Sequence, residues 1–166
     1  GVTDEILAGI DADLRERYSA GVEHPARYMD TMKAGGEDNC AKLVAAVLRA
    51  RGVDAEYVSP SDAGMLLSDE PGAARVLDAA YARLATLAER PGVTIFPGFF
   101  GYATSGKLVT LPRGGSDTTG AVLAKAVNAD VYENFTDVDA VFAANPNIVD
   151  GPAPIRELTY REMREL

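Results

Sequence analysis

The chain has 166 residues, 47% of them hydrophobic, which is enough for one folded domain with a hydrophobic core. Its formal net charge is −9 and it has no cluster of basic residues, which argues against binding to nucleic acid or to an anionic membrane. The single cysteine, Cys40, excludes an internal disulfide, and with one histidine, His24, there is no zinc site of the His/Cys type, so we expect no metal centre. No apolar run is long enough to span a membrane and no signal-peptide pattern opens the sequence, so we expect a cytoplasmic protein.

In the first half of the chain, apolar residues recur at helical spacing. The predicted elements are a helix over 4–20, a helix over 37–52, a strand over 55–59, a loop over 61–70 and a helix over 76–88. The second helix is expected to follow a turn at Gly35-Gly36, with Glu37 in its first turn and Cys40 in its apolar stripe. Gly52 is expected to end it, since glycine readily adopts the left-handed conformation that closes helices.

The second half alternates strands with helices. It predicts a buried strand over 93–96, a hairpin formed by 99–103 and 107–111, a helix behind a glycine pair, a strand over 131–135 and a last helix from Thr159. Such alternation builds an α/β fold with a mostly parallel central sheet covered on both faces, a three-layer α/β/α sandwich. We see no linker, so residues 1–166 are expected to form a single domain.

The run Arg113-Gly114-Gly115-Ser116-Asp117 lies between a predicted strand and a predicted helix. Glycines let backbone N–H groups approach a ligand, a helix start attracts anions, and the arginine fork suits a carboxylate or a phosphate. Asp117 adds a carboxylate, which suits a zwitterion or a site that orients cations, so the run favours a small anionic metabolite over a polymer. The alternative is that Ser116 or Asp117 caps the helix while Arg113 is simply exposed.

Other polar clusters also follow predicted strands, at Gly98–Gly101 and at Thr136–Asp139. Because ligands of open α/β sheets bind at the carboxyl ends of strands, these clusters are expected to converge with the glycine motif. Thr136 and Asp137 either contact a nucleotide or form a turn. Glu37 either complements a helix dipole or holds an ammonium group, and Phe142 either stacks on adenine or belongs to the core.

Four motifs in order resemble the kinase domain of the aspartate kinases, within the amino acid kinase superfamily. They are Gly98-Phe99-Phe100-Gly101, Arg113-Gly114-Gly115-Ser116-Asp117-Thr118-Thr119, Thr136-Asp137-Val138-Asp139-Ala140-Val141-Phe142 and Leu158-Thr159-Tyr160-Arg161-Glu162-Met163. The resemblance is strongest over residues 93–166, and Gly36-Glu37 extends it towards the start. It implies an amino acid kinase fold, truncated here, and transfer of a phosphoryl group from ATP, with Mg²⁺, to the β-carboxylate of L-aspartate. That reaction opens lysine, threonine and methionine biosynthesis.

The resemblance also implies roles for individual residues. Arg113 would bind the substrate α-carboxylate beside Gly114, Gly115 and Ser116. Glu37 would contact the ammonium group, and Asp117, the catalytic residue, would organise the site. The residues implied for the nucleotide pocket are Thr136, Asp137, Phe142 and Asn147, the last at a position where many members have arginine.

The family's strand with the motif Lys-Phe-Gly-Gly-Thr-Ser, whose lysine neutralises the transferring phosphoryl group, has no counterpart in this sequence. We therefore expect the 166-residue chain alone to have little aspartate kinase activity. An unpaired sheet edge would also favour a homo-oligomer. The alternatives are another phosphotransferase of the superfamily, acting on glutamate, carbamate or UMP, and a non-catalytic module that binds a small anion or a partner chain.

Overall fold

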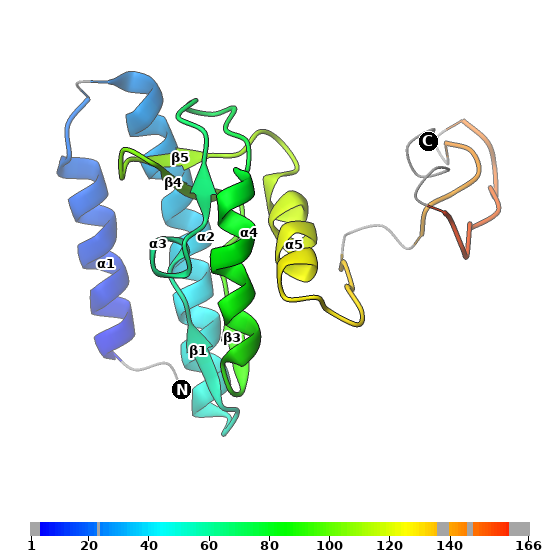
Figure 1. The fold of residues 1–166 in the computed structure, drawn as a ribbon, viewed down its shortest axis with the longest axis horizontal. Helices are drawn as coiled ribbons and strands as arrows, with labels where there is room; N and C mark the ends of the chain where they lie inside the picture. The colour runs from blue at the N-terminus through cyan, green and yellow to red at the C-terminus, as the bar shows by residue number, and fades with distance from the viewer. Residues whose placement is uncertain (1–3, 23, 136–139, 146–147, 160–166) are drawn as a thin grey trace. The chain divides into compact units, whose positions relative to one another are not determined.

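The fold is described from a computed structural model, which describes residues 4–22, 24–135, 140–145 and 148–159 (Figure 1). The chain forms two compact units, Gly1–Tyr132 and Glu133–Leu166. The elements of the first unit are α1 (Asp4–Ser19), α2 (Pro25–Ala50), β1 (Ala55–Tyr57), α3 (Pro60–Ala63), β2 (Leu66–Leu67), α4 (Asp78–Leu84), the 3₁₀ helix η1 (Ala85–Glu89), β3 (Val93–Ile95), β4 (Phe100–Ala103), β5 (Leu108–Thr110) and α5 (Gly115–Ala126).

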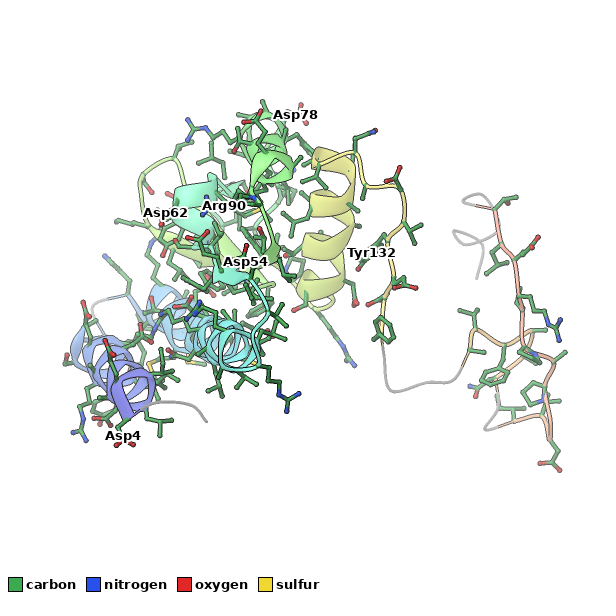
Figure 2. The ribbon with its side chains drawn as sticks, turned by 90° about the horizontal axis from the view of Figure 1, so that it is seen from below. Asp4, Asp54, Asp62, Asp78, Arg90 and Tyr132 are labelled. Atoms are coloured by element: carbon green, nitrogen blue, oxygen red, sulfur yellow. The ribbon has the colours of Figure 1, made fainter. Side chains whose placement is uncertain are left out.

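The strands form two small sheets that confirm the predicted α/β class. β1 pairs with β3 in parallel, and β4 lies between β2, to which it is parallel, and β5, to which it is antiparallel. The β4–β5 pair is the predicted hairpin, turning at Gly106, where φ is +77°. In Figure 2, α1 and α2 lie on one side of the strands, and α4 and α5 lie on the other.

The core lies between the strands and the helices α4 and α5. Its largest fully buried side chains include Phe100, Met65, Leu67, Leu84 and Val109. The hairpin approaches the rest of the core closely, because a Cβ on Gly101 would lie 2.6 Å from the carbonyl oxygen of Met65. This close approach fixes β4 and β5, and therefore the loops at their ends.

A buried polar cluster joins α1, α2 and β1. Asp38 of α2 accepts hydrogen bonds from Arg17 (2.7 Å), Lys42 (2.8 Å) and the hydroxyl of Tyr57. Burial, together with the hydrogen bond to Asp38, raises the pKa of Tyr57 above its ordinary value. Arg17 also pairs with Asp13 of its own helix at 2.7 Å, and Asn39 of α2 donates to Asp13 at 2.7 Å. α1 is thus held against α2 through the polar groups of Asp13 and Arg17, and none of the residues of α1 is buried.

The second helix differs from the prediction. α2 begins at Pro25 and runs through Gly35 and Gly36, so the expected turn before Glu37 is wrong and Glu37 lies in mid-helix. Gly35 is tolerated there because Arg17 packs on it; a Cβ at Gly35 would lie 3.0 Å from Arg17 Cδ. Cys40 is exposed, not part of the apolar stripe. The end of the helix agrees with the prediction, since Gly52 follows the C-cap residue with φ of +80°.

The predicted strand over 131–135 is absent from the described chain, where these five residues have no regular structure. Val131 is 74% exposed and Phe135 is 90% exposed. A β-rich sequence forms a strand only when a neighbouring strand satisfies its backbone groups, and no described strand pairs with this one. Tyr132 instead lies alongside α5, packed against Gly120 (Figure 2).

Two other segments also depart from their predictions. The expected loop over 61–70 contains most of α3 and all of β2. α3 is stabilised by Ser59, whose side chain caps the helix by accepting hydrogen bonds from the N–H groups of Ser61 and Asp62. The expected helix over 76–88 is α4, which begins at Asp78 and tightens into η1. The last helix was predicted to start at Thr159, and the residues after 159 lie outside the described part of the chain.

Within the second unit, two segments form an isolated antiparallel bridge between Phe142 and Pro154. The N–H of Ala143 donates to the carbonyl of Ala153 at 3.0 Å, and the N–H of Ile155 donates to that of Val141 at 2.8 Å. The carbonyl of Asn145 accepts from the N–H groups of Ile148 and Val149.

Candidate functional site

The glycine motif forms a turn directly before α5. Gly114 is the N-cap residue with φ of +79°, a conformation that glycine adopts without strain. Gly114, and not Ser116 or Asp117, therefore occupies the N-cap position, while the glycine turn and the exposed Arg113 agree with that alternative. Gly115 is buried, and a Cβ there would lie 2.8 Å from Leu111 Cβ and 2.9 Å from Phe99 Cδ2, so no larger residue fits without rearrangement.

The turn at Gly98-Phe99, between β3 and β4, packs against the start of α5. A Cβ on Gly98 would lie 3.1 Å from the Cα, Cβ and Oγ atoms of Ser116. Phe99 has φ of +76°, a strained conformation for an aromatic residue. Two hydrogen bonds hold it: its N–H donates to Thr119 Oγ1 at 3.1 Å, and its carbonyl accepts from the N–H of Leu111 at 2.8 Å.

Glu37 reaches the same place from α2. Its side chain is exposed, and the hydroxyl of Ser116 donates to Glu37 Oε1 at 3.5 Å, the long limit of a hydrogen bond. Glu37 lies in mid-helix, so its carboxylate does not complement the N-terminus of its own helix, and that interpretation is wrong. Three segments far apart in the sequence thus meet: Gly98-Phe99, the first turn of α5, and Glu37.

Arg113 directly precedes the glycine turn, and Asp117 follows it. Both are exposed, and Asp117 lies in the first turn of α5, where a carboxylate interacts favourably with the helix dipole. An oxygen of Asp117 would lie 3.9 Å from a Cβ on Gly114, which places the carboxylate beside the glycine turn. Within the described part of the chain, no ion pair engages the guanidinium of Arg113.

Asp30 is a buried residue that joins α2 to the end of β5, and it was not predicted from the sequence. It lies in α2, is 2% exposed, and accepts hydrogen bonds from the N–H of Thr110 at 2.9 Å, the hydroxyl of Thr110 at 2.8 Å and the N–H of Gly72 at 2.9 Å. The signal in the sequence is a carboxylate among the apolar residues Tyr28, Met29 and Met32.

The residues predicted for the nucleotide pocket are not brought to this point. Thr136, Asp137 and Asn147 lie outside the described residues. Phe142 is half-buried in the second unit, where it forms the bridge to Pro154. The roles predicted for these four residues stay predictions.

Two features were not found among the described residues. No group of three or more His, Cys, Asp or Glu side chains in this part of the chain is arranged to hold a metal ion. No helix in it combines the length and the apolar character needed to cross a bilayer.

The arrangement offers complementary charges to a small molecule. Arg113 and the backbone of Gly114 and Gly115 suit a carboxylate or phosphate, while the exposed carboxylate of Glu37 suits an ammonium group. The side chain of Ser116, in the first turn of α5, contacts Glu37. Such a site fits an amino acid better than a simple anion.

The profile of the amino acid kinase family matches residues 1–166, the whole chain. The chain belongs to the amino acid kinase family. Among its curated relatives, it is 53% identical over 161 residues to Aspartokinase 3 of Bacillus subtilis, covering 97% of this chain and 36% of that protein. It is 38% identical over 143 residues to the aspartokinase of Corynebacterium glutamicum, covering 86% of this chain and 34% of that protein.

Solved structures of the family show the same fold. Aspartokinase III of Escherichia coli, crystallised with aspartate and ADP, superposes with a TM-score of 0.74 at 31% identity, over 92% of this chain and 34% of that one. The same enzyme with lysine and aspartate gives a TM-score of 0.72. The chain thus spans about a third of the length of the relatives that it matches.

Proposed function

We propose that this chain provides the amino-acid-binding part of an aspartate kinase, which transfers the γ-phosphoryl group of ATP to the β-carboxylate of L-aspartate. The observation that carries the proposal is the meeting of Glu37 with the glycine turn at Ser116, since a carboxylate opposite an anion-binding turn matches a zwitterion. The aspartokinase relatives support the same assignment, and the Escherichia coli enzyme was crystallised with aspartate and ADP.

The substrate is bound through its two charged groups on the α-carbon. Arg113 pairs with the α-carboxylate through two parallel N–H groups, and the Gly114 and Gly115 amides lie beside it. Glu37 accepts from the ammonium group, and Ser116 donates to the substrate. Asp117 orients the cationic groups of the site. Because phosphoryl transfer depends on positioning and charge neutralisation, no covalent nucleophile is needed.

The nucleotide is assigned to residues beyond the described site. ATP is the co-substrate, and Thr136, Asp137, Phe142 and Asn147 are proposed to line its pocket. Mg²⁺ is proposed to accompany the ATP phosphates. A cytoplasmic location and a homo-oligomeric assembly belong to the same proposal.

A chimera tests the activity. The chain replaces the matching segment of Bacillus subtilis Aspartokinase 3, and phosphorylation is measured with ATP, Mg²⁺ and a panel of acceptors: L-aspartate, L-glutamate, carbamate and UMP. We expect turnover with L-aspartate, and loss of at least about tenfold in kcat/KM when Arg113 is replaced by lysine. Preference for another acceptor would contradict the substrate assignment. An active chimera that tolerates Arg113→Lys without change would contradict the role of Arg113.

A further inference from the structure

We propose that Asp30 is a positioning residue that sets the distance between the two halves of the amino acid site. The inference rests on the proposed function, in which Glu37 and the turn before α5 bind opposite groups of one substrate. Asp30 lies outside that site, and no substrate group is assigned to it.

The first step in the argument is the position of Asp30 on α2. Asp30 and Glu37 are seven residues apart in one continuous helix, and such positions share a helix face. At about 1.5 Å per residue they are about 10 Å apart along the axis. Whatever fixes Asp30 therefore fixes the height and rotation at which Glu37 is presented.

The second step is the partner of Asp30. Both its oxygens are bound to Thr110, the last residue of β5: Oδ2 accepts from the N–H at 2.9 Å, and Oδ1 accepts from the hydroxyl at 2.8 Å. Thr110 is fully buried, and it stands three residues before Arg113 and six before Ser116. This two-point contact thus locks α2 to the base of the loop that carries the other half of the site.

The third step is the energetic requirement. A carboxylate that is 2% exposed is destabilising unless donors replace the lost water, and Asp30 has three, the third being the N–H of Gly72. A buried amide or apolar side chain would hold two elements together at a lower desolvation cost. A carboxylate with fixed lone pairs adds directional restraint, which is what a site with a defined spacing needs.

The test compares two matched variants of the full 166-residue chain. Thr110→Val removes the hydroxyl that donates to buried Asp30. The control, Tyr57→Phe, removes a hydroxyl that donates to buried Asp38 of the same helix, where Arg17 and Lys42 remain as donors. Thr110→Ser retains the hydroxyl and serves as the conservative rescue, and Asp30→Asn is a second variant on the other side of the contact.

Two measurements are made. NMR titrations give the affinities for L-aspartate and for succinate, which lacks the ammonium group. We expect Thr110→Val and Asp30→Asn to lower the preference for L-aspartate over succinate by about two- to fivefold, because that preference comes from exposed Glu37, whose screened ion pair contributes at most about fivefold. Thr110→Ser and Tyr57→Phe should retain the preference. The second measurement is the amide shifts of Gly114, Gly115 and Ser116 without ligand, which should move in Thr110→Val and not in Tyr57→Phe.

An unchanged preference together with unchanged shifts in Thr110→Val overturns the inference, and so does an equal loss of preference in Tyr57→Phe. If the wild-type chain binds no L-aspartate, the proposed function fails for this chain. The ligand-free shifts of residues 114–116 then decide the role of Asp30 by themselves.

Discussion

Arg113 is exposed at the start of the turn before α5, and its guanidinium can present two parallel N–H groups to one carboxylate. Lysine offers a point charge without that geometry. We expect Arg113→Lys to weaken L-aspartate binding to the chain by about ten- to a hundredfold, or about 1.5–3 kcal/mol. Arg51→Lys, at the exposed C-cap residue of α2, is the matched control. Equal affinities for the two variants in an NMR titration would remove Arg113 from the site.

Glu37 is expected to act only on the ammonium group. Because its side chain is exposed, the pair that it forms is screened by water and contributes about 1 kcal/mol at most. Glu37→Gln should therefore weaken L-aspartate binding by about fivefold and leave succinate binding unchanged. A parallel loss for both ligands would mean that the substitution disturbs the turn at Ser116 and that Glu37 does not recognise the ammonium group.

At the scale of elements, the turn at Gly98 depends on a close approach to α5. Gly98→Ala would place a methyl group 3.1 Å from three atoms of Ser116, so either the turn or the helix must shift. We expect a loss of about 1–3 kcal/mol in unfolding free energy and weaker L-aspartate binding. The control is Gly9→Ala in α1, where nothing lies within 4 Å of the added atom.

The control should have the opposite sign, since alanine in a helix is favoured over glycine by about 0.5–1 kcal/mol. Urea unfolding measures both variants. If the Gly98→Ala chain is as stable as wild type and binds L-aspartate with unchanged affinity, the close contact between Gly98 and Ser116 does not constrain the turn.

The contact between α1 and α2 should depend on pH. Burial by itself would raise the pKa of Asp13, but hydrogen bonds from Arg17 and Asn39 outweigh burial and hold that pKa below its ordinary value of 3.8. The stabilisation by the Asp13 carboxylate is then complete above about pH 4 and is lost as the pH falls through the lower, folded-state pKa.

Asp13→Asn should accordingly lower the unfolding free energy at neutral pH and have a smaller effect at acid pH below the folded-state pKa, where the wild-type carboxyl is protonated as well. Urea titrations of both chains at the two pH values measure the difference. A difference of the same size at low pH would show that Asp13 stabilises α1 without its charge.

Local sequence signals predicted those elements whose structure is determined locally. The helix over 4–20, the hairpin around Gly106 and the end of α2 at Gly52 were predicted because spacing and glycine positions determine them. The course of α2 through Gly35-Gly36 was not, because packing of Arg17, from another helix, offsets the poor helix propensity of glycine. The prediction of a strand over 131–135 was wrong for a related reason. A strand forms only when a neighbouring strand pairs with it, and the residues of the segment itself do not show whether such a neighbour exists.

The candidate site was also predicted only in part from the sequence. Motif order and spacing identified Glu37, Arg113 and the glycine turn, and the structure brings Glu37 and Ser116 together. Asp30 was missed because its role comes from a contact with Thr110, eighty residues further along the chain. Phe99 was noticed only as part of a motif, and its strained backbone is visible only in three dimensions.

At the scale of the whole molecule, we expect binding without efficient catalysis. The sequence lacks a counterpart of the family's lysine strand, and loss of one preorganised electrostatic group typically costs about 10²–10³ in rate. With ATP, Mg²⁺ and L-aspartate, the 166-residue chain should therefore turn over at least about a hundredfold more slowly than the chimera. Equal rates would show that the chain supplies its own cation for the phosphoryl group.

The central claim, that Glu37 and the turn before α5 form an amino acid site, is tested most directly by titrating L-aspartate into the ¹⁵N-labelled chain and following the backbone amides. The account predicts saturable shifts at Gly98, Phe99, Gly114, Gly115 and Ser116, with weaker binding of succinate. It is contradicted if these amides stay unmoved at saturating L-aspartate, or if the shifts fall on another surface of the first unit.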